Sequence, residues 1–169
     1  MANSRAMSTS ALKDCLEKHG IALLIVPTIG KAPIDACSTM ANGHPCLTVT
    51  CRRNDLDKLA FDILHQLCHI GRHLSGPSAT FLSVEQDEPS PNPLDKEADA
   101  YASEMLIPGK IWARIIGVGC NSLSPSKVAK TIATESEKFC ISPSIAMSRY
   151  RKETGWYRST TYKSPKIHG

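Results

Sequence analysis

The strongest constraint on the fold of this sequence is one amphipathic segment that carries two histidines. Between residues 54 and 71 the apolar side chains recur at helical spacing and form a single stripe. The members of that stripe are Leu56, Ala60, Ile63, Leu67 and Ile70. His65 and His69 lie four residues apart on the same predicted helix, so their imidazoles project from one face, one turn apart. Two imidazoles in that arrangement can bind a single metal ion.

The rest of the chain alternates between short strand patterns and helix patterns. Strands are expected over residues 21–27, 34–40 and 46–51, where apolar or alternating runs are bounded by glycine, proline or Asn-Gly. Helices are expected over 10–19, 54–71, 92–107, 111–116, 124–139 and 142–154, with a long surface loop over 75–93. This order predicts an α+β domain in which a small twisted three-stranded sheet packs on a mostly helical body.

Cysteine usage and the N-terminal residues indicate a cytoplasmic protein with reduced thiols. The seven cysteines are an odd number and form no CxxC pair, which argues against a secreted disulfide framework. No apolar run is long enough to span a membrane, and residues 1–10 lack the apolar core of a secretory signal. We interpret residues 1–10 as a disordered leader or a cloning remnant, residues 11–158 as one domain and residues 159–169 as a basic tail.

A zinc ion held by two histidines needs further ligands, and an acidic side chain is the usual third one. Glu97 is the candidate, because it opens the next long helix and the loop before it allows that helix to return against the first. Two other acidic residues are rivals. Asp99, two residues on, is expected to point elsewhere, whereas Glu104 shares the side of Glu97 and is a candidate to hydrogen-bond a ligand. The prediction is one Zn²⁺ ion bound by His65, His69 and Glu97.

Three stretches of the sequence carry motifs of a known family. Residues 61–70 read Phe-Asp-Ile-Leu-His-Gln-Leu-Cys-His-Ile, residues 95–108 read Asp-Lys-Glu-Ala-Asp-Ala-Tyr-Ala-Ser-Glu-Met-Leu-Ile-Pro, and residues 141–150 read Ile-Ser-Pro-Ser-Ile-Ala-Met-Ser-Arg-Tyr. They resemble the metal-binding helix, the following helix and a late segment of the ImmA/IrrE family of small bacterial metallopeptidases. The resemblance implies a zincin-like domain with the His-x-x-x-His helix at its centre, and the zinc ligands His65, His69 and Glu97.

The same resemblance implies limited proteolysis of a regulatory protein, such as a repressor or an antitoxin-like partner, in a stress or phage-defence response. The family has glutamate where this chain has Gln66, and that glutamate is the general base that takes a proton from the attacking water. The amide of glutamine forms hydrogen bonds but is no base at neutral pH. We therefore expect metal binding to remain and peptide hydrolysis to be abolished or nearly so. Gln66 is either an engineered inactivating substitution or the natural residue of a pseudo-peptidase.

Two further side chains are candidates for supporting roles near the ion. His73 extends the histidine face by one more turn, and Tyr101 follows Glu97 by one turn. Each is a candidate to hydrogen-bond a ligand or a developing oxyanion. The alternatives are a polar helix-end role for His73 and core packing for Tyr101.

The cysteines suggest a possible inhibitory contact. Cys46 and Cys51 flank the strand before the metal helix, a strand that could receive a substrate backbone by β-addition. Together with Cys120 they are candidates for a thiol latch that reaches the open position of the metal. Cys68 is offset by one residue from the histidine face, and we expect it to face the core.

Positive charge is concentrated towards the C-terminus. From residue 145 onwards six Lys or Arg residues stand against a single acidic residue. The aromatic residues Tyr150, Trp156, Tyr157 and Tyr162 lie among these cations. Single-stranded DNA or another nucleic acid is therefore a candidate ligand of this segment, whereas no membrane partner is expected. The alternative function is a non-catalytic, metal-containing pseudo-peptidase that binds a protein or nucleic acid as a regulator.

Overall fold

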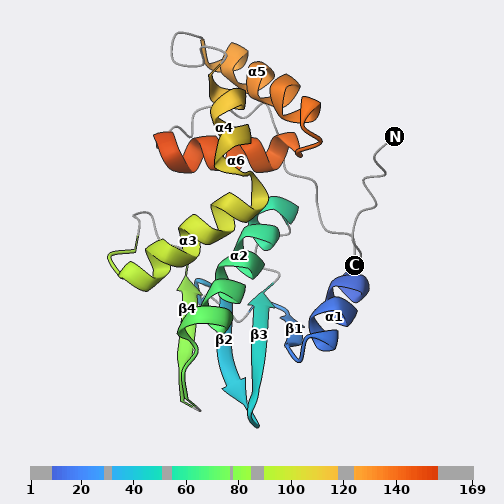
Figure 1. Ribbon diagram of the computed structural model, residues 1–169, viewed down its shortest axis with the longest axis vertical. Coiled ribbons are helices and arrows are strands. Elements are labelled where there is room, and N and C mark those ends of the chain that lie inside the picture. Colours follow the sequence, from blue (N-terminus) through green and yellow to red (C-terminus); the bar gives the residue numbers. More distant parts are fainter. Residues whose placement is uncertain are drawn as a thin grey trace.

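Six helices, a π-helical turn and four strands make up the part of the chain that the computed structural model describes, residues 9–28, 32–50, 55–76, 78–84, 90–117 and 124–155. The helices are α1 (Thr9–Lys18), α2 (Leu56–Cys68), α3 (Pro93–Leu106), α4 (Gly109–Ile116), α5 (Pro125–Lys138) and α6 (Pro143–Thr154). The strands are β1 (Ala22–Val26), β2 (Ile34–Ala41), β3 (His44–Thr50) and β4 (Thr80–Val84), and the π-helical turn η1 (His69–His73) continues α2. The sheet lies at one end, α2 and α3 lie across the middle, and α4, α5 and α6 form the other end (Figure 1). The predicted α+β class is confirmed.

The sheet is mixed, with the strand order β1-β3-β2-β4. β1 runs parallel to β3, whereas β2 is antiparallel to both β3 and β4. β2 and β3 form a hairpin whose turn residues, Asn42 and Gly43, have positive φ angles of 51° and 80°. Those are the angles that a two-residue turn between twisted strands requires. Within the described residues, β3 and β2 are central strands and β1 and β4 are the edges.

The fourth strand corrects the prediction of a three-stranded sheet. β4 occupies Thr80–Val84, inside the segment over 75–93 that the sequence pattern indicated as a surface loop. Its Thr80, Phe81 and Val84 favour a strand, but the proline and serine residues on both sides and the acidic residues after it outweigh so short a run. Pairing with β2 decides the conformation, because the backbone groups of this segment find their partners there.

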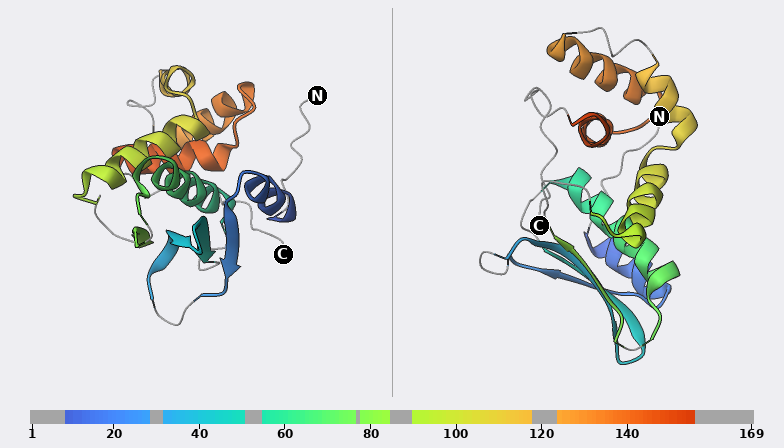
Figure 2. Two further views of the ribbon diagram at one scale, coloured as in Figure 1. Left: turned by 60° about the horizontal axis from the view of Figure 1, so that its bottom comes forward. Right: turned by 90° about the vertical axis from the view of Figure 1, so that its left-hand side faces the viewer.

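The first core lies between one face of the sheet and the helices α1 and α2 (Figure 2). Its buried members are Leu16, Leu23, Ala36, Leu47, Val49 and Ile63. Leu47 is fully buried and pairs with Leu23 on one side and Ser38 on the other, so it lies in the middle of that face. The packing holds α2 across the sheet and thereby sets the direction in which its histidines project.

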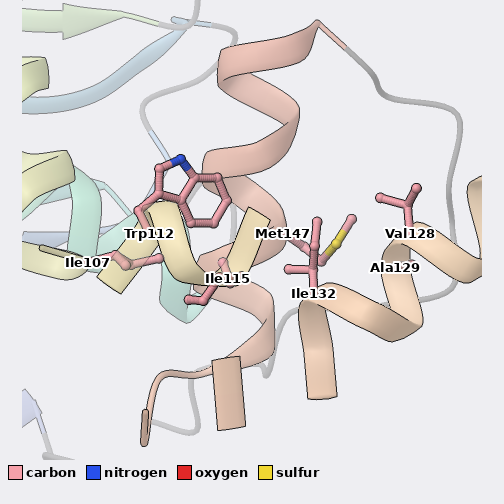
Figure 3. Packing of buried hydrophobic residues seen from close by; sticks show 8 residues of the cluster. Ile107, Trp112, Ile115, Val128, Ala129, Ile132 and Met147 are labelled. Atoms are coloured by element: carbon pink, nitrogen blue, oxygen red, sulfur yellow. The ribbon is translucent and has the colours of Figure 1, made fainter. Parts of the chain in front are cut away.

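The second core joins α4, α5 and α6, and Figure 3 shows its side chains gathered between these helices. Its buried members are Ile107, Trp112, Ile115, Val128, Ala129, Ile132, Ala146 and Met147. Arg149 connects this end of the molecule to α3, because its guanidinium donates to the backbone carbonyl oxygens of Ser103 (3.1 Å) and Ile107 (2.5 Å). The two cores are separate clusters, so a change in one should leave the other's packing intact.

Ile132→Ala is expected to lower the free energy of unfolding by about 2–5 kcal/mol, because Ile132 is fully buried in the second core. Ile25→Ala is the matched control: Ile25 is 41% exposed at the sheet edge, and its truncation should cost less than about 1 kcal/mol. Denaturant titration followed by circular dichroism measures both. Equal losses in the two variants would contradict the assignment of Ile132 to a tightly packed core.

The sequence located α3 correctly, and small residues form its buried face. Asn92 caps the helix, since its side-chain oxygen accepts a hydrogen bond from the backbone N–H of Leu94 at 3.0 Å. Leu94 and Met105 are 37% and 56% exposed, whereas Ala98 and Ala102 are buried. The small alanines allow α3 to approach α2 closely, and polar side chains beside them come within reach of the α2 histidines.

Candidate metal centre

α2, with its continuation η1, runs antiparallel to α3. Two histidines of the first segment each contact an aspartate of α3. Nδ1 of His65 lies 2.9 Å from Oδ1 of Asp99, and Nε2 of His69 lies 3.4 Å from Oδ1 of Asp95. His65 of α2 and His69, the first residue of η1, are four residues apart, as Asp95 and Asp99 are on α3. Both helices therefore present their pair from one face.

Three of these side chains converge on one point. Nε2 of His65 and Nε2 of His69, the histidine pair, are 3.0 Å apart. With a carboxylate oxygen of Asp95 they form a group whose ligand atoms all lie within 4.8 Å of one another. Two nitrogens bound to one tetrahedral ion at about 2.0–2.1 Å lie about 3.4 Å apart, so small side-chain shifts suffice. Two imidazoles and one carboxylate are also a ligand set of catalytic zinc sites. The group can hold one divalent cation.

Asp99 fixes the orientation of His65. Its Oδ1 accepts the Nδ1–H of His65 at 2.9 Å, and its Oδ2 pairs with Nζ of Lys152 on α6 at 2.9 Å. Burial raises the pKa of Asp99, but the hydrogen bonds from His65 and Lys152 outweigh burial and hold the pKa below its usual range. Because an ionised carboxylate can only accept, neutral His65 carries its proton on Nδ1 and turns the lone pair of Nε2 towards the cluster.

Asp99→Ala is expected to weaken zinc binding about 10–100-fold, because the ring of His65 loses the partner that fixes its orientation and tautomer. Glu104→Ala is the control on the same helix. The carboxylate of Glu104 accepts the backbone N–H of Gly109 at the start of α4 (2.9 Å), so its loss should not change zinc affinity. Competition with a chromophoric chelator measures both affinities. An unchanged affinity in the Asp99 variant would remove this residue from the site.

His69 is enclosed by its neighbours. It is 1% exposed, and Phe81 of β4 stacks on its ring with centroids 4.2 Å apart and an interplanar angle of 15°. Burial is the largest cause that lowers the pKa of His69 to about 4; His65 and His73 lower the pKa further, and the acidic residues of α3 oppose them. The ring is therefore neutral at pH 7, the state in which a ring nitrogen binds a metal.

The buried ring predicts a pH dependence of stability in the metal-free chain. Between pH 6.5, the ordinary pKa, and the folded-state pKa of about 4, His69 is protonated in the unfolded chain but not in the folded one. The unfolded state then binds more protons, so the free energy of unfolding should fall as the pH falls through this window. Denaturation at a series of pH values tests this. His69→Gln should flatten the profile, and identical profiles would contradict the assignment.

Glu97, the expected third ligand, points to another part of the surface. Its carboxylate accepts a hydrogen bond from Nη1 of Arg72 at 2.6 Å and contacts Nε2 of His73 at 3.3 Å. Hydrogen bonding to Arg72, and then to His73, holds the pKa of Glu97 below its usual range. In the part of the chain described here, no group joins this carboxylate to the histidine pair within 4.8 Å. Glu97 follows Asp95 by about 200° around the helix, so Asp95 takes the place beside the histidine pair.

Gln66, which the family resemblance places where a general base is expected, contacts the edge strand β4. It is fully buried, and its Nε2 donates to Oγ of Ser83 on β4 at 2.7 Å. Its Oε1 is buried and has no hydrogen-bond partner among the described residues. An amide with an uncommitted acceptor therefore lies next to the candidate ligand His65 along α2. A glutamate would fit the same position, since the Ser83 hydroxyl can donate to a carboxylate.

The other side chains expected near the ion lie around it at different distances. Nδ1 of His73 is 2.9 Å from Nδ1 of His69, so His73 contacts a candidate ligand from behind. The ring of Tyr101 lies under the guanidinium of Arg72, 5.4 Å from its centroid. Glu104 contacts the start of α4 instead of a ligand.

The cysteines divide between described and undescribed parts of the chain. Cys46 is buried in β3 and belongs to neither of the two metal-type groups found among the described residues. Cys51 and Cys120 lie outside the described residues, as do Trp156, Tyr157, Tyr162 and the basic tail over 159–169. Cys68 is buried, as expected, yet its sulfur also lies close to His73 and Glu97.

Sequence reasoning missed Asp95, Phe81 and Ser83, and it set aside Asp99, which it expected to point elsewhere. The four-residue spacing of Asp95 and Asp99 is the signal that singled out the histidine pair, and applied to α3 it would have found both. Phe81 and Ser83 hold His69 and Gln66 from β4, so they were missed together with that strand.

No family model matches this chain, and no curated protein is significantly similar to it. Among the helices of the described residues, none has the length and apolar character needed to cross a bilayer. The function has to be inferred from the geometry of the site.

Proposed function

We propose that this chain is a zinc-binding domain of the metallopeptidase type, akin to the ImmA/IrrE family and zincin-like in arrangement. The observation that carries the proposal is the convergence of Nε2 of His65, Nε2 of His69 and the carboxylate of Asp95, with Asp99 behind His65. This is a three-ligand set backed by a carboxylate–histidine contact, as in zinc enzymes. A zinc ion bound there would supply Lewis acidity that polarises a peptide carbonyl.

The chain's own residues position the ligands and leave one side of the cluster accessible. Asp99 orients His65, and Phe81 stacks on His69. The side chains of Asp95 and Asp99 are 26% and 31% exposed, whereas His69 is 1% exposed. A substrate would therefore approach from the side of the α3 carboxylates.

The edge strand β4 is where we expect the substrate peptide. Phe81 and Ser83 of β4 contact His69 and Gln66. An extended peptide that pairs with this edge strand would therefore run past the candidate metal ligands. β3, the strand that the sequence suggested for this role, lies between β1 and β2 and has neighbours on both sides. The substrate class proposed is a repressor or antitoxin-like regulator, in a stress or phage-defence response.

With Gln66 in place, we expect the chain to bind a substrate but not to hydrolyse it efficiently. Its amide cannot take up a proton at neutral pH, so the attacking water has no carboxylate to activate it. The chain as it stands should hold a substrate and cleave it hardly at all.

A non-catalytic binding module is the second function, and the burial of Gln66 favours it. The amide is fully buried, and its Nε2 donates to Ser83, so a residue of β4 is placed to hold a glutamine here. In this function the metal stabilises a surface that recognises a regulatory protein or a nucleic acid.

Incubation of candidate repressor and antitoxin-like proteins with the chain and with its Gln66→Glu variant separates the two functions. The proposal predicts a stable complex with the chain and chelator-sensitive cleavage of the same protein by the variant. Binding without cleavage by both forms would establish the binding module. Cleavage that continues after removal of metal would contradict the metallopeptidase.

A further inference from the structure

A second group of ligand-type side chains lies beside the first. Sγ of Cys68, a ring nitrogen of His73 and a carboxylate oxygen of Glu97 all lie within 4.8 Å of one another. They belong to the end of α2, to η1 and to α3. We propose that this group is a second metal site, selective for thiophilic divalent cations such as Zn²⁺, Co²⁺ or Cd²⁺, and that its occupation excludes a metal from the first site.

The three donors suit a borderline or soft cation. A thiolate, an imidazole and a carboxylate are all zinc ligands, and the thiolate favours soft metals over Mg²⁺ or Ca²⁺. Cys68 is 2% exposed and the His73 side chain 7%, whereas the Glu97 side chain is 44% exposed. Packing therefore holds Cys68 and His73 in place, and the cation enters from the side of Glu97. When the cation binds, the thiol of Cys68 releases its proton to solvent.

Arg72 is the cation that now pairs with Glu97. The two groups are 2.6 Å apart, and their side chains are 54% and 44% exposed. Exposed ion pairs contribute little to stability, so a divalent cation can displace this guanidinium. Arg72 keeps a contact after displacement, because its guanidinium already lies over the ring of Tyr101.

One hydrogen bond between imidazoles links the second site to the first. Nδ1 of His69 and Nδ1 of His73 are 2.9 Å apart, so one ring must donate and the other accept. When His69 donates, its Nε2 is a bare lone pair, and His73 carries its proton on Nε2 next to Glu97. When His73 donates, its own Nε2 is bare, and His69 carries its proton on Nε2.

Each arrangement opens one site and closes the other, because a metal needs a bare nitrogen. In the second arrangement the Nε2–H of His69 has two acceptors, Nε2 of His65 at 3.0 Å and Oδ1 of Asp95 at 3.4 Å. These acceptors are the atoms that would hold a metal in the first site. A cation at the second site therefore fixes His69 as a donor and removes it as a ligand. Inhibition of a peptidase by such a cation rests on the proposed function, but the second site itself does not.

Cobalt titration of the metal-free chain tests the second site on its own. Thiolate-to-cobalt charge transfer in the near ultraviolet reports coordination by sulfur. His65→Ala disables the first site, and this variant should develop the band. Adding Cys68→Ala should abolish the band, whereas adding Cys15→Ala, which removes an exposed thiol on α1, should leave it unchanged. Asp95→Ala is a second way to disable the first site, and it keeps all three imidazoles. It should develop the same band as His65→Ala, so a folding defect of one variant does not decide the test.

The coupling is measured in the unsubstituted chain. Equilibrium dialysis should find one cobalt per chain at saturation. Because two sites that exclude each other share that one ion, the thiolate band should reach only a fraction of its amplitude in the His65→Ala variant. Absence of the band in both first-site variants would overturn the second site. Two cobalt ions per chain, with the band at the full amplitude of the His65→Ala variant, would overturn the exclusion. The single variant Cys68→Ala keeps only the first site. If this variant binds no metal, the proposed function fails but the second site does not.

Discussion

Asp95→Ala is expected to lower zinc affinity at the first site more than about 100-fold, since even loss of a partner behind a ligand costs about 10–100-fold. Its carboxylate shares a group with the two histidines, and its Oδ1 lies 3.4 Å from Nε2 of His69. Measurement in a Cys68→Ala background leaves only the first site to bind, so competition with a chromophoric chelator reports that site alone.

Glu97→Ala is the matched control in the same background. Glu97 reaches His69 only through His73, with contacts of 3.3 Å and 2.9 Å, so its loss should weaken zinc binding by less than about tenfold. A large loss of zinc affinity in the Glu97 variant and a small loss in the Asp95 variant would identify Glu97 as the third ligand, as the sequence first suggested.

Gln66→Glu is expected to raise peptide hydrolysis by about 10²–10⁴-fold, the range that a positioned general base contributes. The glutamate would replace a buried amide 2.7 Å from the hydroxyl of Ser83, which can donate to a carboxylate and hold it in place. Initial rates on a denatured or peptide substrate, with the unsubstituted chain as the reference, give the ratio.

Two controls connect that gain to the site. Asn92→Asp adds the same charge at the cap of α3, which tolerates aspartate, and should leave the rate at background. Combining Gln66→Glu with Asp95→Ala should also return the rate to background. A Gln66→Glu variant that binds zinc fully but is no faster than the unsubstituted chain would show that this fold is not a peptidase whose base has been replaced.

The sequence predicted those elements whose periodicity is long and well bounded. α2, α3, α5 and α6 follow from apolar spacing between caps and stops, as at Gly155, whose φ of 66° ends α6. β4 did not follow, because five residues between acidic and proline-rich neighbours give no clear period. Its conformation comes from pairing with β2, which is a tertiary interaction.

The candidate site was predictable as far as one helix and not beyond it. The histidine pair lies on α2 and its continuation η1, and it follows from helical geometry alone. The choice of Asp95 over Glu97 depends on the rotation of α3 against α2, which the buried Ala98 and Ala102 set. Lys152 of α6 contacts Asp99 but lies more than fifty positions away in the chain, so no local sequence pattern predicts that contact.

Crystals of the chain grown with one equivalent of zinc, and diffraction data collected on either side of the zinc absorption edge, test the central claim most directly. We expect a single anomalous peak bonded to Nε2 of His65, Nε2 of His69 and a carboxylate oxygen of Asp95. A zinc-saturated crystal without anomalous density between these three side chains would contradict the metal centre and the function proposed from it.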